Sequence, residues 1–289
     1  MPEPAGAAGR AGAADARARA HGHLRERGFQ WAVGTLQEMT SAGMPQGDPL
    51  AADSFLVREG GAIAAQRHRD RFAAQAAVAG PFDERRVAEF VEAGWALLAA
   101  EPGDWFPRFE LASTAIGPRL FLRLRPAPPP AERAVLVTAE EDPRTAPERK
   151  GPDLTALAAL RRRAGALGAD EAVLADPSGS VVDGSAAAIL WWRGEWLVRP
   201  DPSLLRLPSV TAELLWELAG DTGTDRRSER ITPGALAASG AEVWLVNALH
   251  GIRPVTAWLG EPGPSVRSVD TARLERWRAT LEALRTPLS

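Results

Sequence analysis

The chain has 289 residues, 45% of them hydrophobic and 25% charged, which suffices for one large or two modest globular domains. A formal net charge of -3 gives no support for a nucleic-acid partner, and the apolar runs are too short to span a membrane. The absence of cysteine excludes disulfides and a thiolate nucleophile, and with four histidines we expect no metal site.

Residues 1–25 are rich in Ala, Gly and Arg and lack the continuous apolar segment of a secretory signal. This composition predicts a disordered tail. Without a secretory signal, we expect a cytoplasmic location.

A small N-terminal domain is predicted at residues 26–124. Apolar periodicity and the Gly and Pro positions predict, in chain order, a strand, two helices and two strands, at residues 53–58, 66–80, 83–100, 109–113 and 120–124. Asp83 is the expected N-cap of the second helix.

Residues 125–132 contain three consecutive prolines and are predicted to be a linker. Residues 133–289 then form a larger C-terminal domain, with strands and helices predicted at 134–138, 153–167, 171–176, 180–184, 187–194, 195–200, 207–220, 242–247 and 270–285. Because strands and helices are mixed rather than strictly alternating, the pattern favours an α+β fold with two domains.

Lys150 is the only lysine in the chain. An amine can lose its proton and attack a carbonyl carbon, whereas a guanidinium stays protonated and cannot form a Schiff base. Coding bias is the alternative explanation for the single lysine. A composition rich in Ala, Arg and Gly indicates a genome with few lysine codons, in which one lysine can remain by chance.

Four segments resemble, in the same order, the class IV pyridoxal-phosphate enzymes, a family that includes branched-chain and D-amino-acid aminotransferases and aminodeoxychorismate lyase. The segments are HRDRF from His68, RKGPDLTALAALRRRAGALGADEAVLAD from Arg149, VVDGSAAAILWW from Val181, and the two loops LPSVT and VNALHGIRPV from Leu207 and Val246. The resemblance covers about residues 53 to 260 and implies the two-domain fold of fold-type-IV enzymes.

The resemblance also implies roles at matching positions. Lys150 takes the place of the lysine that forms a Schiff base with pyridoxal 5'-phosphate and later moves the substrate α-proton. Arg71 takes the place of an arginine on the cofactor phosphate. Asp183 takes the place of the carboxylate at the pyridine nitrogen, where an anion keeps the ring protonated and able to accept electrons.

The two loops complete the implied cofactor site. Val210 and Thr211 match the turn whose backbone N–H groups hold phosphate at a helix N-terminus, and Asn247 and Ala248 match a strand-end loop that also faces it. For single motifs a structural alternative stays open: a solvated helix face for His68 and Arg71, and a hairpin aspartate at Asp183-Gly184.

Three departures from the family pattern are visible. Asp183 replaces the usual glutamate, Ser209 replaces a glycine, and the chain has no tyrosine to contact the 3'-oxygen of the cofactor. Other polar residues are further candidates for the active-site lining, with plain surface positions as the alternative: His250, Arg253, Arg119, Arg123 and Arg125.

The resemblance therefore implies a class IV aminotransferase that acts on a small amino-acid or keto-acid substrate. The alternatives are β-elimination of the aminodeoxychorismate lyase type, which the Asn247-Ala248-Leu249 loop favours, and a weakened family member that acts as a binding protein. The family's active site lies near a dimer interface, so we expect a homodimer. Trp191, Trp192 and Trp196 belong either to that interface or to the core.

Overall fold

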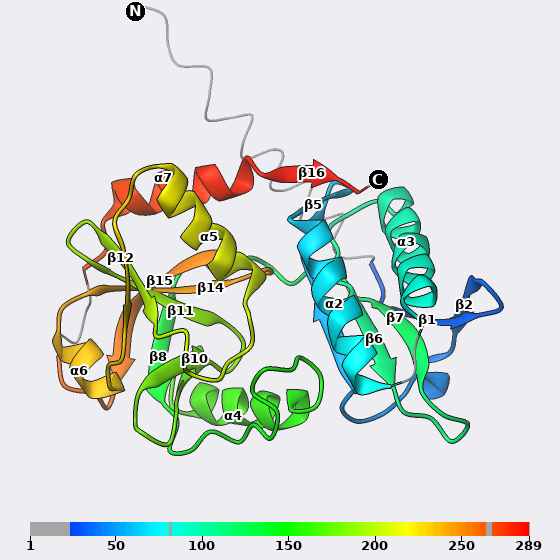
Figure 1. Cartoon of the computed structure of the whole chain (residues 1–289), viewed down its shortest axis with the longest axis horizontal. Coiled ribbons are helices and arrows are strands. Elements are labelled where there is room, and N and C mark those ends of the chain that lie inside the picture. The colour runs from blue at the N-terminus through cyan, green and yellow to red at the C-terminus, as the bar shows by residue number, and fades with distance from the viewer. Residues whose placement is uncertain (1–23, 81–82, 264–267, 289) are drawn as a thin grey trace, which may run out of the picture.

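The computed structural model describes residues 24–80, 83–263 and 268–288, arranged as two lobes (Figure 1). The predicted N-terminal tail lies almost entirely outside the described residues. The elements in both lobes confirm the α+β class.

The small lobe contains a five-stranded antiparallel sheet with the order β2-β1-β7-β6-β3. Its strands are β1 (Arg27–Ala32), β2 (Thr35–Met39), β3 (Ala51–Ser54), β6 (Arg108–Ala112) and β7 (Arg119–Leu124). A short 3-10 helix, η1 (Ser41–Gly43), lies between β2 and β3. Sequence patterns predicted β6 and β7 but neither β1 nor β2.

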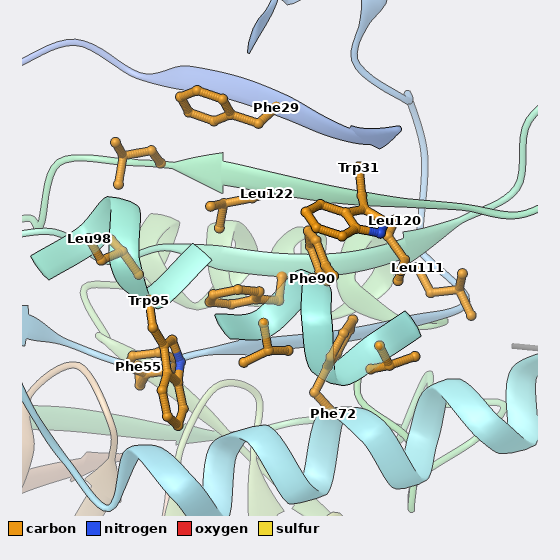
Figure 2. Packing of buried hydrophobic residues seen from close by; sticks show 14 of the residues in the cluster. Phe29, Trp31, Phe55, Phe72, Phe90, Trp95, Leu98, Leu111, Leu120 and Leu122 are labelled. Carbon is orange, nitrogen blue, oxygen red and sulfur yellow. The ribbon is translucent and has the colours of Figure 1, made fainter. Parts of the chain in front are cut away.

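Two helices, α2 (Ala65–Ala79) and α3 (Glu84–Ala100), pack against this sheet (Figure 1). Asp83 caps α3 as predicted, because its side chain accepts a hydrogen bond from the Arg85 N–H. Phe72 and Phe90 meet Phe109 of the sheet, with ring centroids 6.2 and 5.5 Å from it, in a core rich in aromatic side chains (Figure 2).

The large lobe contains an eight-stranded sheet with the order β10-β9-β8-β15-β14-β11-β12-β13. Its strands are β8 (Ala134–Thr138), β9 (Glu171–Ala175), β10 (Val181–Gly184), β11 (Ala188–Arg193), β12 (Trp196–Pro200), β13 (Arg226–Glu229), β14 (Glu242–Asn247) and β15 (Gly251–Leu259). The helices of this lobe are α4 (Leu154–Ala166), α5 (Val210–Asp221), α6 (Pro233–Ala238) and α7 (Thr271–Glu282).

Tryptophan side chains fill the core between the large sheet and α7. Trp192, Trp244 and Trp277 meet edge to face with ring centroids 5.4 to 6.1 Å apart. Trp191 and Trp192 are buried within this single chain, which confirms core packing for these two residues. Trp196 is partly buried against a neighbouring part of the core.

The chain's last strand crosses back to the small lobe. β16 (Arg285–Pro287) pairs with β5 (Gly61–Ile63), which pairs with β4 (Val57–Arg58). In Figure 1, β16 and β5 lie at the top of the small lobe, beside the end of α7. The sequence pattern predicted helix as far as residue 285, but α7 ends at Glu282 and β16 begins at Arg285. It also predicted one continuous strand at 53–58, but Phe55 and Leu56 interrupt it between β3 and β4. Residues 125–132 form no helix or strand, and the domain boundaries drawn there stay predictions.

No helix among the described residues combines the length and apolar character that crossing a membrane requires.

Candidate active site

A cavity of about 400 Å³ lies where the two lobes meet, and every residue predicted for the cofactor site lines it. The small lobe contributes Arg71 from α2, and the segment before α4 contributes Lys150. The large lobe contributes the rest from the end of β10, the start of α5 and the end of β14: Asp183, Val210, Thr211, Asn247 and Ala248.

Backbone hydrogen bonds to the small lobe hold Lys150 in place. Its N–H donates to Gln75 Oε1 at 3.0 Å, and its carbonyl accepts from the Ala52 N–H at 2.7 Å. The next residue, Gly151, has a φ of +143°, and a Cβ there would lie 2.7 Å from the Pro49 carbonyl oxygen. Only glycine therefore lets the chain pass this close to β3.

The Lys150 amine is chemically unusual. Burial lowers its pKa to about 8, an effect that the charge of Asp53 opposes and the charges of Arg71 and Arg125 reinforce. A substantial fraction of the amine is therefore neutral near pH 8, which is the form that reacts with carbonyl carbons.

Arg71 is anchored by a buried carboxylate that sequence reasoning missed. Asp53 is 1% exposed and accepts from Arg71 Nε at 2.6 Å and from His68 Nδ1 at 2.8 Å. Burial acts to raise the pKa of Asp53, but the neighbouring cations outweigh it and hold the pKa below its usual range. His68 and Arg71 thus form a buried network, and the interpretation as a solvated helix face is wrong.

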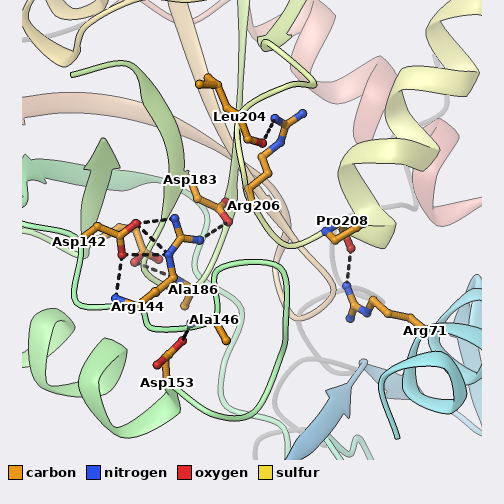
Figure 3. A network of polar contacts seen from close by, with 11 residues as sticks. Arg71, Asp142, Arg144, Ala146, Asp153, Asp183, Ala186, Leu204, Arg206 and Pro208 are labelled. Carbon is orange, nitrogen blue, oxygen red and sulfur yellow. Dashed lines mark hydrogen bonds and ion pairs between the residues drawn. The ribbon is translucent and has the colours of Figure 1, made fainter. Parts of the chain in front are cut away.

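Arg71 also reaches the large lobe. Its Nη1 donates to the Pro208 carbonyl at 2.9 Å, just before α5 begins (Figure 3). Ser209 has an ordinary φ of -79° and caps α5 through its side chain, so this position requires no glycine. In an α-helix the N–H groups of Val210 and Thr211 have no acceptor within the helix, which leaves them available to an anion.

Asn247 shapes the loop opposite the start of α5. Its Oδ1 accepts from the N–H groups of Leu249 and His250 at 3.1 and 2.8 Å, while its Nδ2 donates to the Ala186 carbonyl at 3.1 Å. The amide therefore ties the end of β14 to the chain after β10, and it fixes Ala248 at the cavity wall.

Asp183 lies within β10, paired with Leu174 of the antiparallel β9, and is therefore a strand residue and not the turn aspartate of a hairpin. Arg144 Nη1 lies 3.4 Å from its Oδ2, and Asp142 holds the other side of the same guanidinium (Figure 3). Burial raises the pKa of Asp183 to about 7, and the charges of Arg144 and Arg206 oppose this rise.

The other polar candidates for the active-site lining lie at different places, and only one of them lines the cavity. Arg125 lines the cavity. Arg123 instead pairs with Glu110 at 2.8 Å, and Arg119 donates to the Pro118 carbonyl. His250 lines a second cavity, of about 470 Å³, which shares Thr211 and Asn247 with the first, and Arg253 faces Glu171 at 3.7 Å outside both.

Comparison with known proteins identifies a family. The model of the family described as amino-transferase class IV matches residues 50–258, which is more than half of the chain. A search of curated protein sequences finds no match.

Several solved structures share the fold. A fold IV transaminase from Curtobacterium pusillum, CpuTA1, has a TM-score of 0.74 at 20% identity, with 90% of this chain and 98% of that chain covered. A hypothetical aminotransferase from Mycobacterium tuberculosis in its PLP-bound form has a TM-score of 0.71 at 19% identity, covering 89% and 98%. A putative 4-amino-4-deoxychorismate lyase from Legionella pneumophila has a TM-score of 0.66 at 16% identity, covering 81% and 90%. At these identities the likeness is one of fold.

Proposed function

The chain belongs to the class IV aminotransferase family, and on this basis we propose that it is a pyridoxal-phosphate-dependent enzyme that acts on an amino acid through Lys150. The observation that carries the proposal is the position of Lys150. The only lysine of the chain lines the interlobe cavity, and its amine has a pKa lowered to about 8.

The cavity offers groups suited to each end of the cofactor. Arg71 and the N–H groups of Val210 and Thr211 at the start of α5 would hold the phosphate, beside the loop of Asn247 and Ala248. Asp183 would supply the carboxylate for the pyridine nitrogen. Lys150 would supply the amine, Nζ, for the aldehyde end of the cofactor.

Bound pyridoxal phosphate supplies an electron sink for negative charge on the substrate α-carbon. Lys150 would also serve as the base for the substrate α-proton, because its lowered pKa lets Nζ accept and return a proton near neutral pH. Arg144 favours the ionised form of Asp183, which must be anionic to hold a protonated ring nitrogen.

Transfer of the amino group is the first proposal, and β-elimination of the aminodeoxychorismate lyase type is the second. The loop Asn247-Ala248-Leu249 favours the second. A weakened member that only binds ligands is the third candidate, supported by the absence of tyrosine and by Asp183 in place of glutamate.

Product analysis separates these reactions. Protein loaded with pyridoxal phosphate is incubated with single amino acids, with and without 2-oxoglutarate, and separately with 4-amino-4-deoxychorismate. Transfer yields the matching keto acid and glutamate, whereas elimination yields pyruvate from 4-amino-4-deoxychorismate without an acceptor. Lys150→Ala abolishes either reaction, whereas Arg162→Gln on the exposed face of α4 leaves it unchanged. Loaded protein that yields neither product from any of these substrates supports the binding protein.

We also propose that the protein is a homodimer, which sedimentation of the purified chain tests directly. A mass of one chain, 30.8 kDa, contradicts the proposal. The cytoplasmic location stays a prediction.

A further inference from the structure

Asp183 enters the cavity from an irregular part of β10. The pairing of β10 with β9 shifts register between Val181 and Asp183, which gives β10 one extra residue at this point. Such a bulge bends the strand and redirects the side chains beside it. The direction of the Asp183 carboxylate therefore depends on what holds the chain immediately after the bulge.

The next residues, 184–187, form a turn that lines the cavity. The first N–H of the turn donates to its last carbonyl at 2.7 Å, and the Ser185 N–H donates to the Ala172 carbonyl of β9 at 2.9 Å. The side-chain amide of Asn247 donates to the Ala186 carbonyl of the same turn. The turn is thus tied to both neighbouring strands of the cavity wall.

A buried carboxylate holds this turn from outside the cavity. Glu171, the first residue of β9, is 1% exposed and lines neither cavity. Its Oε1 accepts from Ser185 Oγ and from the Ala186 N–H, the latter at 3.0 Å. A Cβ on Gly184 would lie 3.2 Å from Glu171 Cγ, so the Glu171 side chain also packs directly against the start of the turn.

The acid at this position has an electrostatic cost. Burial raises the pKa of Glu171, although the Ser185 hydroxyl and two nearby arginines oppose the rise. One of these arginines, Arg253, has its Nη2 3.7 Å from Glu171 Oε2. The charge of Glu171 also adds to the effect of burial on the pKa of Asp183. An ionised acceptor forms hydrogen bonds roughly twice as strong as those of a neutral one, so the gain at this position is a firmly held turn.

We propose that Glu171 is a positioning residue for Asp183. By holding Ser185 and Ala186, it fixes the end of the bulged strand, so that the Asp183 carboxylate points into the cavity at the place assigned to the pyridine nitrogen. This inference rests on the proposed function, because it concerns the same cofactor site. Glu171 lies outside the cavity, and its effect on the reaction passes through Asp183.

Nuclear magnetic resonance of the cofactor-free protein tests this role. Carbon-13 spectra follow the carboxyl carbon of Asp183, identified by its loss in Asp183→Asn, and we expect it to titrate near pH 7 in the wild type. Glu171→Leu removes the acceptor and should lower this midpoint by about one pH unit or more, because the released carboxylate reaches solvent. Glu171→Gln keeps an acceptor oxygen for Ser185 and Ala186, and it should lower the midpoint by about half a unit or less.

Two further variants complete the comparison. Ser185→Ala removes one of the two bonds to Glu171 and should lower the Asp183 midpoint by an intermediate amount, which decides the question if Glu171→Leu fails to fold. Glu275→Gln, on the exposed face of α7, should leave the midpoint unchanged. A midpoint that stays the same in Glu171→Leu and Ser185→Ala overturns the proposal. Equal shifts in Glu171→Leu and Glu171→Gln also overturn it, because only the charge of Glu171 would then matter.

A double-mutant cycle connects the position of Asp183 to ligand binding. Pyridoxine 5'-phosphate, which has the ring nitrogen and the phosphate but no aldehyde, is titrated calorimetrically into each protein. Glu171→Leu should weaken its binding by about fivefold or more in the wild type, but by less than about twofold in Asp183→Asn. Equal losses in both backgrounds would reveal a general structural effect and contradict the positioning role.

The two measurements separate this inference from the proposed function. A wild type that does not bind pyridoxine 5'-phosphate contradicts the cofactor site, and with it the proposed function. The titration of Asp183 in the cofactor-free protein still decides whether Glu171 holds this carboxylate in place.

Discussion

The Lys150 amine is the residue whose environment matters most. It is held by its own backbone to Gln75 and β3, so the side chain enters the cavity from a fixed point. Burial and neighbouring arginines favour the neutral amine, while Asp53 favours the charged one. The balance leaves a nucleophile that is usable near neutral pH.

This balance predicts the pH dependence of Lys150 reactivity. Because the folded pKa is lowered, the neutral amine is present above about pH 8 instead of above about 10.5, and the rate of adduct formation with pyridoxal phosphate should rise with a midpoint near 8. Stopped-flow absorbance measures the rate, and peptide mapping separates Lys150 from the α-amino group. A midpoint near the ordinary lysine value contradicts the environment described for Lys150.

Stability should follow the same titration. A lowered amine pKa means that the unfolded chain binds more protons above about pH 8, so the free energy of unfolding should rise by about 1–2 kcal/mol between about pH 8 and pH 10 relative to Lys150→Met. Urea unfolding of the cofactor-free protein at these pH values measures the difference. If the free energies of unfolding of the wild type and of Lys150→Met change in parallel with pH, the lowered pKa of Lys150 is contradicted.

Gly151 is the residue on which the approach of Lys150 to β3 depends. Gly151→Ala places a Cβ 2.7 Å from a backbone oxygen at a positive φ, and we expect a loss of about 2–3 kcal/mol in the free energy of unfolding. Gly165→Ala in α4 is the control, because open space surrounds it and alanine favours helix by about 0.5–1 kcal/mol. Equal effects of the two changes on denaturant midpoints contradict the close approach.

Sequence motifs found the residues that line the cavity but not the residues that orient them. Lys150, Asp183 and Asn247 each lie in a recognisable segment of chain. Asp53 and Arg144 belong to no such motif, because the residues they orient, Arg71 and Asp183, come from distant segments and no sequence spacing marks the pairs.

At the scale of elements, the longest periodic patterns were predicted best. The apolar stripe of α3 and the cap at Asp83 identify that helix from sequence. The strands β2 and β16 are short and partly exposed, so no alternation of buried and exposed residues marks them. In β1, buried Phe29 and Trp31 do alternate with less buried neighbours, but over only four residues. Their pairing comes from tertiary contact.

The return of β16 to the small lobe should contribute measurably to stability. Leu288, just after β16, is buried in the aromatic core of the small lobe, and its N–H donates to the Gly60 carbonyl at 3.0 Å. Leu288→Ala should lower the free energy of unfolding by about 2–3 kcal/mol through the cavity it leaves. Leu167→Ala, at an exposed leucine, should change it by less than about 0.5 kcal/mol. Thermal denaturation compares them, and matching melting temperatures would show that the C-terminal strand adds no stability.

At the scale of the whole molecule, the candidate active site is formed by residues of both lobes. Arg71 of the small lobe contacts Pro208 of the large lobe, and Arg67 pairs with Glu217 at 2.9 Å across the same boundary. Composition and pattern predicted the α+β fold and its two parts. The contacts between the lobes were not predictable, because they join residues that are far apart in the sequence and meet only in the packed fold.

The covalent state of Lys150 tests the central claim most directly. Protein incubated with pyridoxal phosphate is reduced with borohydride, digested and mapped by mass, beside Lys150→Ala. We predict that the reduced cofactor is found on the peptide that contains Lys150, with a matching absorbance band that the variant lacks. A wild type that carries no label on this peptide at saturating cofactor contradicts the assignment of Lys150, and with it the proposed enzyme.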